Sequence, residues 1–262
     1  MKSFADILAA TQKMGPKKIA IAGEPNDELA DALNRAAELG IGEAVIFETA
    51  NDGAVAVRDG EADVFMKGSV DTPSFMRAVL DKENDFRTGR LINHVFVFEA
   101  FDRLMLLTDA GICIDPNLDD KAETVRNIVP VARRLGIETP KIAVLAAIEK
   151  INPKMPTTLD ADALSKMDLP DCHVQGPLAL DLAVSPGAAA TKGIPGPVAG
   201  QADVLLMPNV ETGNILAKAL MYMCHCGSGG VVSGTKRPVT FSSRSDSADT
   251  KLHTIALGVL MS

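Results

Sequence analysis

Short apolar runs alternate with amphipathic stretches along most of the chain. The runs at residues 18–22 and 43–47 are too short for helices and predict strands. Residues 27–39 have apolar positions at helical spacing and end at Gly40, which predicts a helix with a glycine stop. Repetition of this pattern predicts an α/β fold, in which a parallel or mixed sheet is covered by helices.

The same patterns predict further elements down the chain. Strands are predicted at residues 63–66, 95–98, 103–108, 141–146, 204–207 and 239–241, and helices at residues 72–80, 119–135, 212–223 and 250–260. The strands at 95–98 and 103–108 are close enough to pair as a hairpin. Residues 1–14 predict an amphipathic helix and not a signal peptide, because Asp6 interrupts the apolar portion. Residues 151–158 and 227–230 are predicted to be loops, the first rich in proline and the second in glycine.

Two breaks in composition, at residues 109–120 and 236–238, suggest two domains. The first α/β domain would be discontinuous, comprising residues 1–114 and 237–262. The second α/β domain would comprise residues 115–236. A cleft would then lie between the domains, a frequent place for ligand sites.

Composition narrows the classes of protein that remain possible. The 262 residues are 47% hydrophobic with a formal net charge of −8, which disfavours general binding to nucleic acid because that requires a basic face. No apolar run has the length of a membrane span. The four cysteines do not form a disulfide framework in a chain of this length, and buried or inert cysteine is favoured over a metal site at Cys224 and Cys226. We expect a cytoplasmic protein with no nucleic-acid or membrane partner.

The densest cluster of reactive groups lies at residues 242–249, between a predicted strand and a predicted helix. It carries four serines, Arg244 and the two carboxylates of Asp246 and Asp249. Helix starts attract anions through their unpaired N–H groups, and the arginine fork matches phosphate oxygens. The alternative is a structural role, since Ser243 and Asp246 have a capping-box-like spacing and Asp246 or Ser247 could cap the helix. The stretch alone does not decide between these two interpretations.

A second candidate is the turn that follows the strand at 63–66. Lys67, Gly68 and Ser69 lie at the carboxyl end of that strand, where ligands bind in open α/β sheets. The P-loop spacing is absent, and on its own the turn is more often structural. Thr72 opens the next helix, and Arg77 either reaches the same turn or lies on the solvated face of that helix.

Four polar residues in the second half complete the candidate substrate-binding set: Asp181, Lys192, Glu211 and Asn214. Lys192 begins a loop rich in glycine and proline, and such loops are more often functional than idle. Asp181 could instead cap a helix, and Glu211 could simply favour the positive end of one.

Taken together and in order, these motifs resemble the phosphate acetyl/butyryltransferase family, and its phosphate butyryltransferase branch most closely. The pieces that carry the resemblance are MKGSVDT at 66–72, DAG at 109–111, EKINPKMPTT at 149–158, GPLALD at 176–181, PVAGQADV at 197–204, ETGNILAK at 211–218 and SSRSDS at 242–247. The first sixty residues match more loosely, and the chain is somewhat short for the family.

The resemblance implies a two-domain fold like that of isocitrate and isopropylmalate dehydrogenases, with an interdomain cleft and usually a homodimer. It also implies reversible transfer of a short-chain acyl group, butyryl or acetyl, between coenzyme A and phosphate. Coenzyme A and acyl phosphate would be substrates, and no metal or nicotinamide cofactor takes part.

The resemblance further implies roles for individual residues. Ser243 would be the donor near the carbonyl, Arg244 would hold the acyl phosphate, and Arg77 would match an arginine of the family's cleft. The acetyltransferase branch has an aspartate as thiol base seven residues after the motif serine, where this chain has Thr250. Asp246 or Asp249 would then serve as base, or nearby cations would ionise the thiol without one.

Two other functions fit parts of the sequence. A dehydrogenase acting on hydroxy acids with NAD would use the same fold, but there is no G-x-G-x-x-G motif and no convincing aspartate cluster. A non-catalytic protein that binds coenzyme A or acyl phosphate is the other alternative, and Thr250 is the reason to consider it.

Overall fold

The computed structural model describes all 262 residues, which form two compact units. Unit 1 comprises Met1–Arg90, Val97–Arg103 and Cys226–Ser262, and unit 2 comprises Leu91–Phe96 and Leu104–His225. The limits of these units differ from the domain limits expected at 114/115 and 236/237. The two-domain division and its cleft stay predictions.

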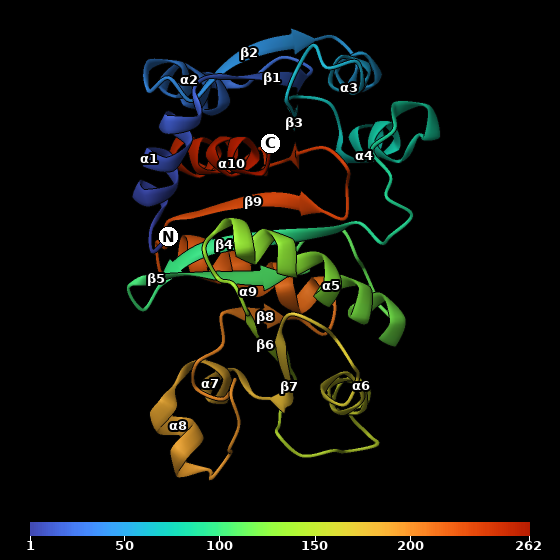
Figure 1. The fold of residues 1–262 in the computed structure, drawn as a ribbon, viewed down its shortest axis with the longest axis vertical. Coiled ribbons are helices and arrows are strands. Elements are labelled where there is room, and N and C mark those ends of the chain that lie inside the picture. The colour runs from blue at the N-terminus through green and yellow to red at the C-terminus, as the bar shows by residue number, and fades with distance from the viewer. The chain divides into compact units, whose positions relative to one another are not determined.

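Unit 1 is built on a largely parallel sheet in the order β2-β1-β3-β10-β9 (Figure 1). β1 pairs in parallel with both β2 and β3, β3 pairs in parallel with β10, and β10 pairs antiparallel with β9. The strands are β1 (Lys17–Ala22), β2 (Gly42–Phe47), β3 (Val64–Lys67), β9 (Ser228–Ser233) and β10 (Val239–Thr240). The carboxyl ends of β1, β3 and β10 therefore meet at one edge of the sheet.

Helices cover the sheet of unit 1. They are α1 (Phe4–Met14), α2 (Asp27–Glu38), α3 (Ala50–Arg58), α4 (Thr72–Leu80) and α10 (Ala248–Met261), with a 3₁₀ turn, η1, at Lys82–Asn84. Alternate residues of β1 and β3, such as Ile19 and Met66, join a buried cluster with α2 and α10. Phe65 points to the other face, where its ring stacks on Phe75 of α4 with centroids 4.5 Å apart.

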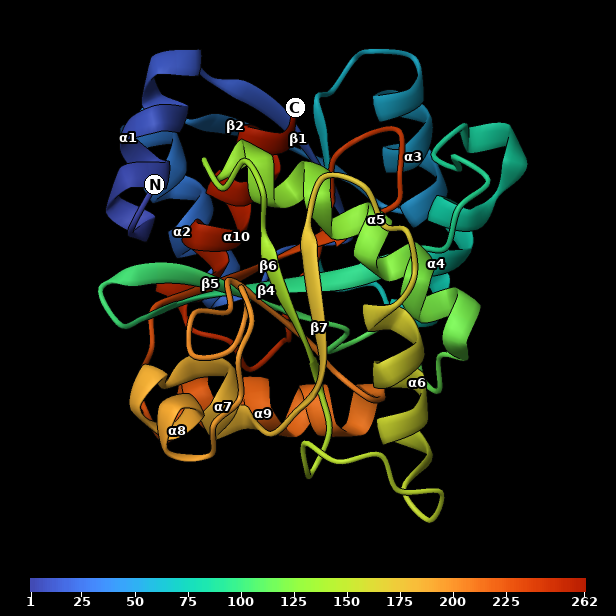
Figure 2. The ribbon, with the colours of Figure 1, turned by 60° about the horizontal axis from the view of Figure 1, so that its bottom comes forward.

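Unit 2 contains a parallel arrangement in the order β5-β8-β6-β7, with helices around it. Its elements are β5 (Arg103–Thr108), α5 (Leu118–Arg134), β6 (Lys141–Leu145), α6 (Pro156–Ser165), β7 (His173–Leu178), α7 (Leu180–Val184), α8 (Pro186–Thr191), β8 (Val204–Leu206) and α9 (Val210–Tyr222). Figure 2 shows β6 and β7 side by side with α6 beside them. This succession of parallel strands and helices confirms the α/β class.

β4 (Asn93–Ala100) neighbours β5 in the strand order, as the predicted hairpin requires. The two connecting residues, Phe101 and Asp102, have φ values of 54° and 55°. Positive φ at both positions is the geometry of a type I′ hairpin turn.

The predicted loop at 227–230 is wrong, because β9 begins within this glycine-rich run. A Cβ on Gly229 would lie 3.0 Å from the backbone nitrogen of Thr254 in α10. Glycine is therefore required here so that helix and strand backbones can approach closely, and not to make a loop. The proline-rich loop predicted at 151–158 is correct only through Met155, because α6 starts at Pro156. No helix in the chain combines the length and the apolar character needed to cross a bilayer.

Candidate active site

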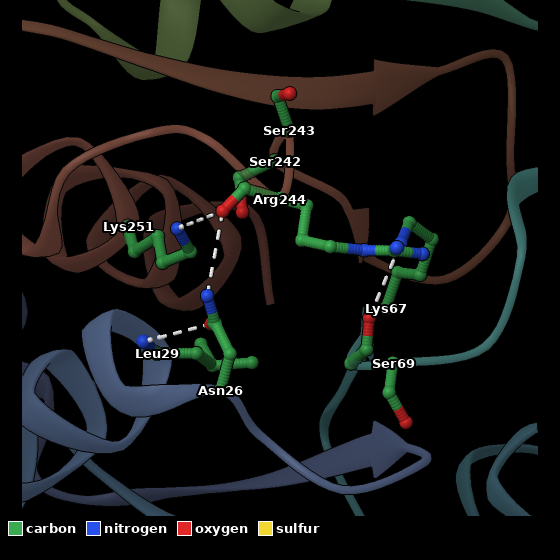
Figure 3. Close-up of a pocket in the computed structure, with 9 residues that line it drawn as sticks. Asn26, Leu29, Lys67, Ser69, Ser242, Ser243, Arg244 and Lys251 are labelled. Carbon is green, nitrogen blue, oxygen red and sulfur yellow. Dashed lines mark hydrogen bonds between the residues drawn. The ribbon is translucent and has the colours of Figure 1, made fainter.

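A small pocket lies in unit 1 at the carboxyl ends of β3 and β10 (Figure 3). Three segments far apart in the sequence line it: the start of α2, the turn after β3, and the stretch from the end of β10 into α10. The lining residues are Asn26, Leu29, Lys67, Gly68, Ser69, Ser242, Ser243, Arg244 and Lys251. The two stretches that the sequence analysis singled out independently are thus brought to one pocket.

The turn after β3 is fixed by backbone contacts with β1. Gly68 donates its N–H to the carbonyl of Ala22 at 2.9 Å. A Cβ on Gly68 would lie 2.8 Å from the same oxygen and closer still to the carbonyl of Gly23, so only glycine fits. Lys67, the last residue of β3, is 8% exposed, and its Nζ donates to the carbonyls of Gly68 and Val70 at 3.1 Å each.

The surroundings of Lys67 disfavour its charged form. Burial is the largest cause, and the neighbouring cations of Arg244 and Lys251 add to it, so the pKa of Lys67 lies below the usual lysine value. The carboxylate of Asp71 acts in the opposite direction without cancelling the shift.

The loop between β10 and α10 is held by a side-chain carboxylate. Asp246, which is buried, accepts a hydrogen bond from the backbone N–H of Ser243 at 2.7 Å. Its own backbone N–H donates to the carbonyl of Ser243 at 3.1 Å. Ser247 is the N-cap of α10, accepting from the N–H of Thr250. The capping interpretation is therefore correct for Ser247, whereas Asp246 closes the loop that presents Arg244.

Lys251 of α10 stabilises this loop, and its role was not predicted from the sequence. The side chain is 2% exposed, and its Nζ donates to the backbone carbonyls of Arg244, at 3.4 Å, and Asp246. Asn26 donates to the same carbonyl of Arg244 at 3.4 Å. A signal for Lys251 existed: it lies four residues before Ile255 and eight before Val259, on the buried face of α10.

The side chains of the loop point in different directions. In Figure 3 Arg244 extends its guanidinium toward Lys67, whereas Ser243 points away from it. The Ser243 hydroxyl lies 3.1 Å from the hydroxyl of Ser245. Arg244 and Lys251, with the amine of Lys67 beside them, make the pocket a candidate site for an anion.

Besides Asp246, three predicted residues of unit 1 do not line this pocket. Asp249, in the first turn of α10, forms an ion pair with Arg35 of α2 at 2.8 Å, and its side chain is 70% exposed. Thr72 is exposed at the start of α4. Arg77 is exposed on the same helix and donates to the hydroxyl of Ser74 at 2.6 Å.

The other four predicted residues belong to unit 2. Asp181 lies in the first turn of α7, and Glu211 in the first turn of α9. Lys192 pairs with Glu149 at 3.3 Å, and Asn214 donates to the carbonyl of Ala110 at 3.0 Å. Their part in a substrate site stays a prediction.

The pocket contains neither an acidic residue nor a cysteine or histidine among its lining residues. The chain as a whole has no group of three or more such side chains arranged to hold a metal ion. The lining therefore offers positive charge and hydroxyls, which suit phosphate oxygens and not a cation.

The sequence matches known proteins along nearly its whole length. The family model described as phosphate acetyl/butaryl transferase matches residues 5–259. The phosphate butyryltransferase of Clostridium acetobutylicum is 42% identical, with an alignment that covers 100% of this chain and 98% of the relative. The phosphate acetyltransferase of Thermotoga maritima is 44% identical over 78% of this chain and 72% of its own length.

Solved structures agree with this result and correct one expectation. A branched-chain phosphotransacylase from Enterococcus faecalis superposes with a TM-score of 0.84 at 31% identity, covering 93% of this chain and 99% of the other. A phosphotransacetylase from Streptococcus pyogenes gives a TM-score of 0.80 at 20% identity, with 98% of each chain covered, and shows the fold alone. The expected isocitrate/isopropylmalate dehydrogenase-like fold is therefore wrong, and the fold is that of the phosphotransacylases. Alternating strands and helices define the α/β class, but they do not define strand order, which separates one such fold from another.

The comparisons confirm the class of enzyme expected from the sequence, a phosphate acyltransferase, and give no support to a dehydrogenase. The family model and the full-length relatives agree with one another and with the phosphotransacylase fold. The chain belongs to the phosphate acetyl/butyryltransferase family.

Proposed function

We propose that this enzyme moves a short-chain acyl group, butyryl or a similar acyl chain, between coenzyme A and phosphate. The observation that carries the proposal is the pocket at the ends of β3 and β10, where Lys67, Arg244 and Lys251 converge among serine hydroxyls. Coenzyme A is a substrate in this scheme, and no metal or nicotinamide is required.

Arg244 is assigned to the phosphate of the acyl phosphate. Its guanidinium offers parallel N–H donors that match two phosphate oxygens, and its backbone is held in place by Asn26 and Lys251. The cations and serine hydroxyls of the lining suit the reacting acyl phosphate, and the nucleotide part of coenzyme A would bind elsewhere.

Ser243 is assigned to the carbonyl oxygen, which becomes negatively charged when the thiol attacks. Its hydroxyl lies against that of Ser245 and points away from the Arg244 guanidinium, so this role requires a different χ1 rotamer. Loss of one such donor costs about 10²–10³ in rate. Holding the two substrates in line supplies a further large part of the acceleration.

The other predicted residues are assigned supporting roles. Gly68 and Ser69 shape the pocket wall, and Asp246 holds the loop that carries Arg244. The remaining part of the substrates is assigned to the polar residues predicted from the sequence, which are Thr72, Arg77, Asp181, Lys192, Glu211 and Asn214. Asp249 is the least suited to a chemical role, because it is exposed and paired with Arg35.

The test is a panel of acyl phosphates assayed with coenzyme A by thioester formation and phosphate release. We expect turnover with short acyl chains, near-complete loss in Arg244→Ala and partial recovery in Arg244→Lys. Arg126→Ala is a matched control, because Arg126 lies on α5 and forms only a local pair with Glu123. Full activity of Arg244→Ala would refute the assignment of the site, and no turnover with any acyl phosphate would refute the proposed function.

A non-catalytic binding role is the second candidate, and one observation favours it. Thr250 stands where the acetyl branch has its base, and no carboxylate lines the pocket. Calorimetry with coenzyme A and a non-hydrolysable acyl phosphonate distinguishes the two, since binding without turnover would support this alternative.

A homodimer in the cytoplasm completes the proposal. α9 and the residue after it carry exposed apolar side chains, with Ile215 70%, Tyr222 52% and Met223 78% exposed. Side chains of this kind grouped on one helix suit an interface with a second copy. The four free cysteines suit a reducing compartment. Light scattering of the wild type and of Ile215→Glu tests the dimer, and a wild-type monomer would refute it.

A further inference from the structure

The proposed reaction consumes a thiol, and the pocket must deal with the thiol's proton. A thiol with a pKa near 8.5 is mostly protonated at neutral pH, and the thiolate is the nucleophile. The two carboxylates nearest in sequence to Arg244 are both occupied. Asp246 is turned to the N–H of Ser243, and Asp249 is paired with Arg35 outside the pocket. No acidic side chain lines the cavity.

Lys67 has the geometry of a proton acceptor. Its side chain lies in the pocket wall at the end of β3, and Nζ donates to two backbone carbonyls, those of Gly68 and Val70. A neutral amine has two N–H bonds and one lone pair. When both N–H bonds are directed to these carbonyls, the lone pair takes the remaining tetrahedral position.

We propose that Lys67 accepts the proton of the coenzyme A thiol during acyl-CoA formation and returns it in the reverse direction. This inference rests on the proposed function, because it assigns a step within that reaction. It gives the pocket the thiol base that Thr250 does not provide.

The step balances without any further reactant. The S–H bond breaks and its proton moves to Nζ of Lys67, while a sulfur electron pair forms the S–C bond and the carbonyl π pair moves onto the oxygen. The carbonyl then re-forms as the C–O bond to phosphate breaks, and phosphate leaves with that electron pair, opposite Arg244. The new ammonium of Lys67 adds positive charge as negative charge develops on the substrate, and it finally gives its proton to the departing phosphate or to water.

Three charged groups face Lys67 and set how readily it gives up its proton. Arg244 comes from the loop after β10, Lys251 from α10, and Asp71 from the start of α4. The two cations act together with burial to lower the pKa of Lys67 from its usual value, and only Asp71 opposes them. A lowered pKa increases the fraction of neutral amine at working pH, as a general base requires.

Lys251 is less suited to this step. It is 2% exposed, and its Nζ lies beneath the loop, against the carbonyls of Arg244 and Asp246. Figure 3 shows it beside the Arg244 backbone, whereas the Arg244 guanidinium extends to the opposite side, toward Lys67.

Lys67→Arg is the decisive variant, because it keeps a long side chain with N–H donors and removes the amine that can accept a proton. We expect kcat with coenzyme A to fall about 10²–10⁴-fold, the usual contribution of a general base, with KM for acyl phosphate within about threefold. Selenocoenzyme A carries a selenol that is already ionised at neutral pH, so the variant should regain most of the wild-type rate with it. Lys166→Arg, on an exposed lysine of unit 2 paired with Asp162, is the matched control.

A second variant covers the case in which arginine does not fit. Lys67→Ala leaves space for a small primary amine, and added ethylamine should restore turnover with coenzyme A in proportion to its neutral fraction.

The wild type must first turn over acyl phosphate and coenzyme A; if it does not, the proposed function has failed rather than this inference. If the wild type is active, retention of more than half of kcat by Lys67→Arg overturns the inference. A loss that selenocoenzyme A and ethylamine both leave uncorrected also overturns it, as does a large loss confined to Asp249→Asn.

Discussion

Removing the Asp246 carboxylate should disable the loop that carries Arg244 while leaving the rest of unit 1 folded. Asp246 is 6% exposed, and its Oδ2 accepts the N–H of Ser243 at 2.7 Å. Asp246→Ala removes this acceptor, so the N–H of Ser243, which is half-buried, loses its hydrogen bond to the carboxylate. Asp246→Asn keeps the shape and a neutral acceptor at the same place.

The magnitude follows from the type of hydrogen bond that is lost. A bond to an ionised acceptor contributes about 1.5–3 kcal/mol, against about 0.5–1.5 kcal/mol for a neutral one. If the loop is competent only when closed, this free energy appears in the rate, where 1.36 kcal/mol corresponds to about tenfold. We therefore expect kcat of Asp246→Ala to fall about 10–100-fold, and that of Asp246→Asn by about tenfold or less.

The assay combines kcat with coenzyme A, binding of inorganic phosphate and urea unfolding. Asp162→Ala serves as the control, because Asp162 makes a surface pair with Lys166 in unit 2. The phosphate affinity of Asp246→Ala should weaken together with kcat, because displacement of Arg244 affects both phosphate binding and turnover. The reasoning is refuted if Asp246→Ala retains kcat within threefold of the wild type while remaining folded.

Three further predictions concern stability and reactivity. Gly68→Ala should lower the free energy of unfolding by about 1–3 kcal/mol, because a Cβ would lie 2.8 Å from the carbonyl of Ala22; an unchanged urea midpoint would contradict this. Burial lowers the pKa of His253, which stacks on Phe4, so the folded state disfavours the protonated ring and stability should be lost as pH falls below about 6.5. His253→Phe should flatten this dependence in unfolding measured between neutral and acidic pH, and an equally steep loss in the variant would count against the assignment. Burial, and to a lesser extent Asp109, raises the pKa of the Cys113 thiol to about 12, so only about 10⁻⁴ of this thiol is thiolate at pH 8. Cys113 should therefore escape alkylation in the native protein and react after unfolding, and mass spectrometry would detect the difference.

The principal stretches of the pocket were predictable because their position and their chemistry coincide. Lys67 and Gly68 follow a short apolar run, and Ser243 and Arg244 follow another, so both occur where parallel strands end. Neither run by itself indicates that the two become neighbouring parallel strands, β3 and β10. Pairing over so long a separation is decided by tertiary packing rather than by local pattern.

What the sequence analysis missed has a common physical cause. Lys251 has a residue type that is normally solvent-exposed, but two backbone carbonyls make its burial acceptable. The glycines of β9 have a residue type normally found in loops, yet at Gly229 the backbone of α10 requires the absence of a side chain. In α3, Gly53 likewise lies where a Cβ would meet the ring of Phe65 at 2.9 Å. Each of these positions is determined by a tertiary contact with another segment, which the preference of a single residue type does not predict.

The placement of β10 between β3 and β9 affects how the protein is made. β3 ends at Lys67, whereas β10, the strand that pairs with its free side, begins only at Val239. Until that later part of the chain has been synthesised, the nascent polypeptide presents an open strand edge, the feature through which chains aggregate. β10 leads directly to Arg244, so completion of this part of the sheet and assembly of the anion pocket coincide.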